Sequence, residues 1–189
     1  MAGFELLVVE EMGLVSIRDA KASDKWEVAA VHVRSWQAAY EGLLPDDFLS
    51  GLKIEDRAAR YSFGEGDSDD PVTKVAIDGD KIVGFVTCGT YRDPLISGYG
   101  EVYALYVDPQ YWKRGLGREL LDSSIDHLSR MRFGKAYLWV LEGNRRAIAF
   151  YESVGWFADG TVRSEVIGGV PVGEIRYECD LGVQLLARK

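Results

Sequence analysis

Residues 110–118, QYWKRGLGR, form a short basic segment with two glycines. The preceding residues 101–107, EVYALYV, predict a strand. The apolar residues that follow recur at the spacing of one helical face: Leu120, Leu121, Ile125 and Leu128. Gly115 and Gly117 therefore stand in a strand-to-helix turn, where they serve either tight turning and close packing or the exposure of backbone N–H groups to an anion.

The second interpretation has physical support, because the first turn of a helix carries unpaired N–H groups and a partial positive charge. Lys113, Arg114 and Arg118 add cations nearby. A Rossmann motif is excluded because Leu120 replaces its third glycine, and no P-loop pattern occurs in the chain. The glycine spacing alone leaves the nucleotide undefined.

Composition predicts one globular domain of 189 residues, since 47% of them are hydrophobic. A formal net charge of −8 argues against nucleic acid and anionic membranes as partners. Cys88 and Cys179 are expected to be reduced core thiols, and the opening residues lack a signal sequence, so we expect a cytoplasmic protein. We expect residues 1–11 to be an N-terminal extension, 12–183 the domain and 184–189 a tail.

Further elements flank the glycine turn on both sides. Asp24 and Glu27 resemble a capping box that opens a helix. Two short helices are expected after Pro45, with a break near Gly51. The remaining segments predict an acidic surface loop at 63–71, a hairpin of strands 72–77 and 81–89, a strand at 136–142, a helix after Asn144, and two strands within 160–181. About seven strands are expected in all.

A second motif follows the strand at 136–142, in residues 144–156, NRRAIAFYESVGW. Asn144 is a typical helix N-cap, and Gly155 a typical helix end. Asn144 and Tyr151 are seven residues apart, nearly two helical turns, so they can face the same groove.

Together the two motifs resemble the GNAT acetyltransferase superfamily. The family pattern [Q/R]-x-x-G-x-[G/A] corresponds to residues 112–117, and N-x-x-A-x-x-x-Y-x-x-x-G-[F/W] corresponds to Asn144, Ala147, Tyr151, Gly155 and Trp156. Trp112 stands where the family usually has Gln or Arg. The resemblance covers about residues 14–181 and implies an α/β GNAT fold. That fold is a single mixed, strongly twisted sheet of about seven strands with helices on both faces, splayed between its fourth and fifth core strands.

The resemblance also implies acetyl-CoA as cosubstrate and no metal. Leu105 N–H would support the oxyanion, and Tyr106 and Val107 would line the pantetheine path. The other cofactor-binding residues implied are Trp112, Lys113, Arg114, Gly115, Leu116, Gly117, Arg118, Asn144 and Ala147.

For catalysis, Glu101 occupies the position of the general base in certain GNAT enzymes, fourteen residues before Gly115. Glu101 would act directly or through water. Tyr151 corresponds to the general acid of the family. The acceptor is expected beyond the strand split, with Trp36 and Tyr40 as walls.

These features predict an N-acetyltransferase that acts on a small-molecule amine by direct attack in a ternary complex. Two alternatives stay open: a protein N-terminal or lysine acetyltransferase, and a non-catalytic CoA-binding sensor domain. A homodimer is expected only by analogy with related domains.

Overall fold

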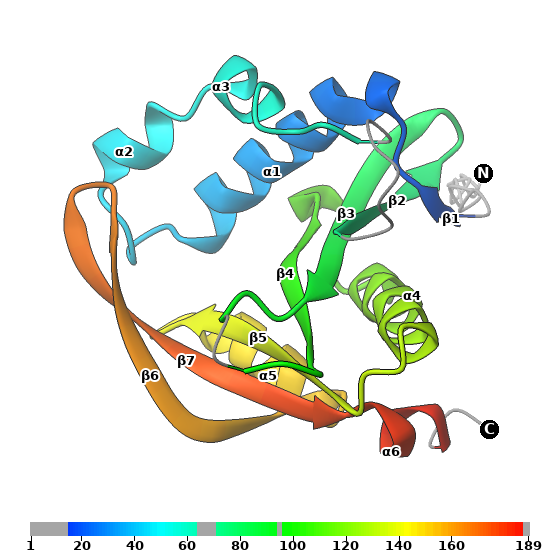
Figure 1. Ribbon diagram of the computed structural model, residues 1–189. Coiled ribbons are helices and arrows are strands. Elements are labelled where there is room, and N and C mark those ends of the chain that lie inside the picture. Colours follow the sequence, from blue (N-terminus) through cyan, green and yellow to red (C-terminus); the bar gives the residue numbers. More distant parts are fainter. Residues whose placement is uncertain (1–14, 64–70, 94–95, 187–189) are drawn as a thin grey trace, which may run out of the picture.

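A computed structural model describes residues 15–63, 71–93 and 96–186 (Figure 1). Its sheet has the order β1-β2-β3-β4-β5-β7-β6. The strands are β1 Ser16–Asp19, β2 Val72–Asp78, β3 Lys81–Thr90, β4 Gly100–Val107, β5 Lys135–Leu141, β6 Phe157–Ile167 and β7 Val170–Asp180. The helices are α1 Lys25–Ala39, α2 Asp46–Ser50, α3 Ile54–Ala58, α4 Leu116–Arg130, α5 Arg145–Ser153 and α6 Leu181–Leu186. The predicted fold and its seven-stranded sheet are confirmed.

The pairing of β4 with β5 is the one parallel pairing in the described sheet. It joins only Gly100 to Ala136 and Glu101 to Tyr137, after which the strands separate. On its other edge, β4 stays paired with β3 as far as Val107. The predicted splay between the fourth and fifth core strands is therefore present, and it opens toward the glycine turn.

Helices cover both faces of the sheet (Figure 1). Helix α1 packs on β3 and β4, with α3 beside it, whereas α4 packs on β2, β3 and β4 from the opposite face. Helix α5 shares the core cluster of α4 through its partly buried residues Ala147, Ile148 and Phe150. No helix in the described part of the chain is long and apolar enough to cross a membrane.

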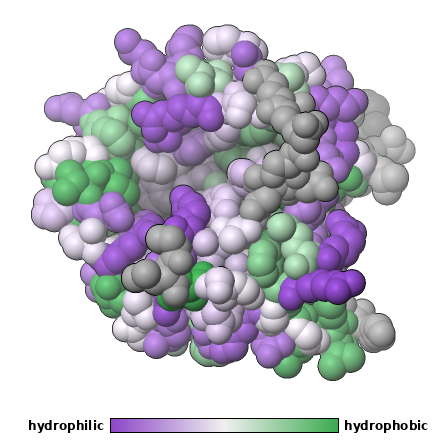
Figure 2. Space-filling model, viewed as in Figure 1, coloured by the Kyte–Doolittle hydropathy of each residue, from purple (hydrophilic) through white to green (hydrophobic). Residues whose placement is uncertain are grey.

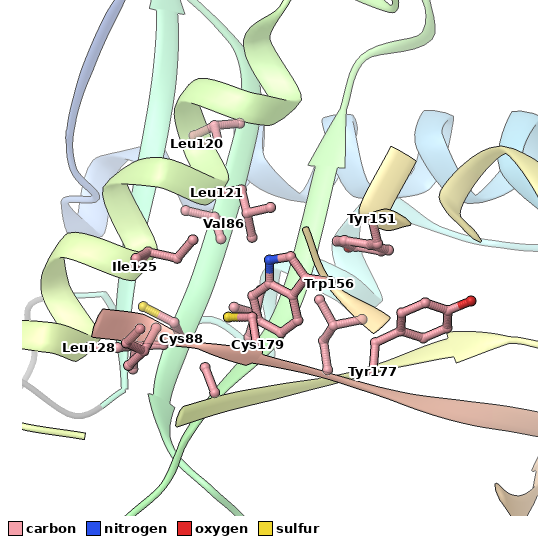
Figure 3. Close-up of a cluster of buried hydrophobic side chains, with 14 of the residues drawn as sticks. Val86, Cys88, Leu120, Leu121, Ile125, Leu128, Tyr151, Trp156, Tyr177 and Cys179 are labelled. Atoms are coloured by element: carbon pink, nitrogen blue, oxygen red, sulfur yellow. The ribbon is translucent and has the colours of Figure 1, made fainter. Parts of the chain in front are cut away.

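The main core lies between α4 and the sheet (Figure 3). Leu120, Leu121, Ile125 and Leu128 point from one face of α4 toward β3, as their spacing predicts. Helix α4 approaches the sheet closely because β3 has a glycine there: a Cβ at Gly84 would lie 3.0 Å from Leu120 Cδ1. The thiols of Cys88 and Cys179 are buried in this core.

Two local features differ from or add to the sequence expectations. Asp24 and Glu27 do not form a capping box with each other. Instead, Asp24 accepts hydrogen bonds from Arg18 and from the backbone of Lys21, and Glu27 accepts one from the N–H of Ile82 in β3. Tertiary contacts thus engage both carboxylates. Helix α6 begins at a buried leucine, Leu181, and extends into residues predicted to be a tail.

We expect Leu120→Ala to lower the free energy of unfolding by about 2–5 kcal/mol, because it leaves a cavity at a site that is 0% exposed. Urea denaturation measures the change. Leu186→Ala is the matched control, since Leu186 is 70% exposed and its loss should alter stability by about 0.5 kcal/mol or less. Equal losses for the two variants would contradict this account of the core.

Candidate active site

A cavity of about 370 Å³ lies beside the open part of β4 and the start of α4. Its lining includes the predicted acid, Tyr151, and ten of the predicted cofactor residues: Leu105, Tyr106, Val107, Trp112, Lys113, Gly115, Leu116, Gly117, Arg118 and Ala147. Most of its accessible wall is apolar. The cavity also takes in Ser35 and Ala39 from α1, and Tyr111, Arg146 and Phe150, none of which the sequence motifs single out.

The glycine turn leaves the start of α4 open to this cavity. Gly115 is the N-cap, with a left-handed φ of 86°, and Lys113 also has a positive φ, of 62°. The N–H groups of Arg118 and Glu119 both donate to the Gly115 carbonyl. Leu116 and Gly117 are the first residues of the helix, so their N–H groups have no carbonyl within the helix to accept them.

Trp112 takes a structural role in the turn. Its indole N–H donates to the Val107 carbonyl at 2.7 Å, and the Arg146 guanidinium lies 3.1 Å from its ring centroid. The indole donor is therefore engaged by protein. The Trp112 ring forms part of the cavity wall, and Arg146 packs on this ring. The family pattern does not specify a cation at position 146.

The edge of β4 that faces the splay can be identified from its hydrogen bonds. The Val107 carbonyl accepts from Ser35 and Trp112, whereas the next N–H, that of Asp108, donates to Val83 in β3. Because backbone groups alternate sides along a strand, Leu105 and Val107 present theirs toward the splay and Tyr106 toward β3. The Leu105 N–H thus faces the opening between β4 and β5.

Among the described residues, the charged side chains that line the cavity are Lys113, Arg118 and Arg146. No Asp or Glu of that part of the chain is in the lining, although the whole chain has a net charge of −8. Arg114 lies outside the lining, with its guanidinium 4.9 Å from the Tyr111 ring centroid. The mostly apolar wall with three cations fits an elongated ligand that has an apolar arm and an anionic end.

Tyr151 closes the inner part of the cavity from α5. It is 9% exposed, and its ring packs near those of Phe150 and Trp156. Burial raises the pKa of the Tyr151 phenol well above its ordinary value, and Tyr106 adds to this shift. Its hydroxyl is consequently protonated at neutral pH. Asn144 lies outside the lining and caps α5 by accepting from the N–H of Ala147 at 3.1 Å.

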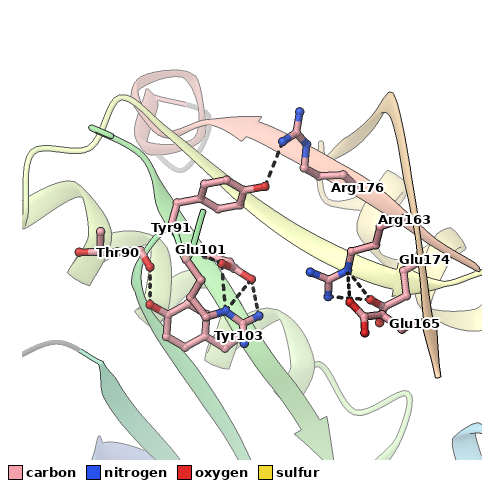
Figure 4. A network of polar contacts seen from close by, with 9 residues as sticks. Thr90, Tyr91, Glu101, Tyr103, Arg163, Glu165, Glu174 and Arg176 are labelled. Atoms are coloured by element: carbon pink, nitrogen blue, oxygen red, sulfur yellow. Dashed lines mark hydrogen bonds and ion pairs between the residues drawn. The ribbon is translucent and has the colours of Figure 1, made fainter. Parts of the chain in front are cut away.

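Glu101 lies at the closed end of the splay, next to Tyr137 in β5. It is 1% exposed, and Arg92 donates to its carboxylate from the backbone N–H at 3.0 Å and from the guanidinium at 2.5 Å. Figure 4 shows Glu101 on the same side of the sheet as Glu174 and Arg176. Glu101 is thus an anion neutralised by an arginine, and Arg92 is a contact that the sequence did not predict.

Trp36 and Tyr40 lie on the α1 side of the sheet, away from the first cavity's lining. Their ring centroids are 5.1 Å apart, with the rings edge to face. The Tyr40 hydroxyl lies 3.4 Å from that of Tyr106, which lines the first cavity. The two predicted acceptor residues therefore lie outside the lining, and both are near Tyr106, which belongs to it.

The site combines a helix N-terminus preceded by glycine with a splayed parallel strand pair, one strand of which has an open amide edge. This arrangement is expected of an acyltransferase domain that binds an acyl-CoA donor. Residues 26–156 match the acetyltransferase (GNAT) family, and the chain belongs to that family. It is an N-acetyltransferase, and GNAT enzymes use acetyl-CoA as the acetyl donor.

Two curated bacterial proteins illustrate the range of relatives. The chain is 29% identical over 140 residues to the uncharacterized N-acetyltransferase YuaI of Bacillus subtilis, covering 74% of this chain and 79% of that protein. It is 38% identical over 94 residues to the mycothiol acetyltransferase of Kocuria rhizophila, covering 46% of this chain but only 30% of that protein.

Solved structures show the same fold. The PaiA N-acetyltransferase of Thermoplasma acidophilum, in complex with coenzyme A, superposes with a TM-score of 0.68 at 18% identity, covering 88% of this chain and 99% of that one. The ribosomal-protein-S18-alanine N-acetyltransferase of Escherichia coli superposes with a TM-score of 0.62 at 22% identity, covering 89% and 94%.

The residues present fit coenzyme A, since the apolar wall suits pantetheine and the cationic end suits pyrophosphate. Gly117 gives a direct test. A Cβ at this position would lie 3.5 Å from the Phe150 ring, an ordinary contact that the fold accepts, while a larger side chain occupies cavity space. We expect Gly117→Val to weaken CoA binding at least about tenfold by calorimetry, with little change in Tm.

Gly134→Val is the control for this prediction, because nothing lies within 4 Å of a Cβ there and Gly134 is outside the cavity. If Gly117→Val binds CoA as tightly as the wild type, the pyrophosphate of CoA does not bind at this turn.

Proposed function

We propose that the chain transfers an acetyl group from acetyl-CoA to a primary amine of a small molecule, by direct attack in a ternary complex. The observation that carries the proposal is the splay of β4 from β5. It leaves Leu105 and Tyr151 beside the donor cavity, whose lining residue Tyr106 lies near Trp36 and Tyr40 on the proposed acceptor side.

A small acceptor is favoured by the way the acceptor side is closed at one end. The tip of the β6–β7 hairpin reaches α2 (Figure 1). A Cβ at Gly168 would lie only 2.6 Å from Phe48 Cγ, so the tip rests directly on α2. An extended peptide would need this end open. Because the relatives include both a mycothiol and a ribosomal-protein acetyltransferase, the fold alone does not choose the acceptor.

Three groups of this chain have proposed roles in the transfer. The Leu105 N–H donates a hydrogen bond to the oxygen that becomes negative at the thioester carbon. Tyr151 donates its phenolic proton to the departing thiolate, a role suited to a buried phenol that stays protonated. Glu101 accepts the proton of the amine, through water because the carboxylate is buried. The proposed cofactor residues are those predicted from the sequence, together with Arg146.

An amine panel with acetyl-CoA, read by release of the CoA thiol, tests the function. Transfer to small amines supports the proposal. Transfer confined to peptide N-termini or lysines would favour a protein acetyltransferase, and tight CoA binding without any transfer would favour a sensor domain.

Tyr151→Phe should lower kcat at least about tenfold where chemistry is rate-limiting, and CoA affinity should stay within about twofold. Since burial raises the pKa of this phenol, the acid form persists as pH rises. The wild-type kcat should therefore show no alkaline fall from Tyr151 below a pH of about 10. Tyr177→Phe is the matched control, because Tyr177 is also a buried tyrosine and lies outside the cavity lining. If Tyr151→Phe keeps the full kcat, Tyr151 is not the general acid.

Glu101→Gln should lower kcat by about 10²–10⁴-fold if Glu101 is the base, since that is the usual contribution of general-base catalysis. Arg92 should remain solvated, because its side chain is 56% exposed in the native protein. Stopped-flow rates and Tm are measured together to separate chemistry from folding. Glu165→Gln on the same side is the control. An unchanged chemical rate in Glu101→Gln would assign proton removal to another group.

A further inference from the structure

A second cavity, of about 610 Å³, lies on the acceptor side between helices α1–α3 and the tip of the β6–β7 hairpin. Trp36, Phe48, Leu52 and Ile167 give it apolar walls. Figure 2, which has the view of Figure 1, shows that this face is hollowed between the helices and the strands. The contact of Gly168 with Phe48 closes the cavity at the hairpin tip.

Three cations line this cavity: Lys53, Arg57 and Arg60. Among the described residues, none of them has a carboxylate within 4.0 Å. Elsewhere on the acceptor side, arginines are neutralised: Arg163 lies 2.6 Å from Glu174, and Arg176 lies 2.7 Å from Asp159.

Arg57 is the best placed of the three. Its guanidinium lies 4.6 Å from the Trp36 ring centroid and is partly buried there. Burial lowers the pKa of Arg57, and the nearby positive charge of Arg60 lowers it further. Burying a cation without an anion is unfavourable, and so is bringing two cations together. An anionic group bound in the cavity would offset both costs.

Asp47 and Asp56 also line this cavity. Both are exposed, and neither forms an ion pair with the three cations in the described part of the chain. These carboxylates therefore lie on the rim, and the partly buried charge of the site is that of Arg57.

The cavity is also close to the donor site. The Trp36 ring, which forms part of its wall, has its centroid 6.5 Å from that of Tyr106, and Tyr106 lines the donor cavity. A ligand against Trp36 is therefore separated from the donor cavity by the thickness of these aromatic side chains. An acceptor with one end here must extend its amine past these rings to reach the splay.

We propose that this cavity binds the anionic group of the acceptor, and that the acceptor is a small amine that also carries a carboxylate, as an amino acid does. The carboxylate pairs with Arg57, assisted by Lys53 and Arg60, and the apolar part of the acceptor lies against Trp36 and Phe48. This inference rests on the proposed function and adds its substrate class.

The test compares free amino acids with their carboxamides and with the matching aminophosphonates in the thiol-release assay. Wild-type protein should use the best amino acid with a kcat/KM at least about tenfold above that of its carboxamide, mainly through KM. Arg57→Met keeps an apolar stem on Trp36 and removes the charge, so it should lower kcat/KM about tenfold for the acid and leave the carboxamide within about twofold. Arg57→Lys should retain most of the activity. Arg130→Met, at an exposed position at the end of α4, is the control.

Calorimetric titration of the CoA-bound protein with the N-acetyl amino acid gives a readout independent of turnover, and Arg57→Met should weaken this binding about tenfold. Equal use of acid and carboxamide, or equal losses for both in Arg57→Met, would overturn the carboxylate subsite and leave the small-molecule function standing. A preference for the aminophosphonate over the carboxylate would overturn the carboxylate assignment. Failure of every amine despite normal CoA binding would refute the proposed function, and the inference with it.

Discussion

The separation of β4 from β5 after two residue pairs is the constraint on which the site depends. A strand in the middle of a sheet ordinarily has both edges hydrogen-bonded, and the open edge of Leu105 and Val107 would be costly if it were buried without partners. The fold engages one carbonyl, that of Val107, with Ser35 and Trp112. The Leu105 N–H remains turned toward a cavity in which a pantetheine arm can pair with the strand.

In the proposed donor site, anion capture rests on the backbone and on cations that the fold brings together. The left-handed Gly115 exposes the start of α4, and the indole N–H of Trp112 is engaged by the Val107 carbonyl. What Trp112 adds is a surface for Arg146, which sits over its ring. A strongly acidic protein can in this way present a local site whose described lining has three cations and no carboxylate.

The acceptor side follows a different electrostatic rule. Around Glu101 and Glu174, each arginine lies against a carboxylate, so that region is a set of neutral pairs (Figure 4). Near Trp36, the cations Lys53, Arg57 and Arg60 form no ion pair with any carboxylate of the described residues. Removing a charge from water is unfavourable, and a nearby opposite charge offsets that cost. The cluster of cations near Trp36 is therefore the part of this face where a bound anion would stabilise the protein most.

Local patterns in the sequence determined much of this protein. The apolar spacing of α4, the hairpin turn at residues 78–80, the Asn144 cap and the two glycines each act through neighbouring residues, and so the strands and helices were predictable. The donor site was predicted from the resemblance that the two motifs carry. Tertiary structure decided which partners several side chains take. Asp24 pairs with Arg18 and Glu27 with the N–H of Ile82, Arg92 neutralises Glu101, and Arg146 lies over the Trp112 ring. Tertiary structure also decided the convergence of α3 with the β6–β7 tip. Some of these pairings join distant segments, as those of Glu27 with Ile82 and of Trp112 with Arg146 do. The energies of all of them depend on burial and distance, which only the folded arrangement supplies.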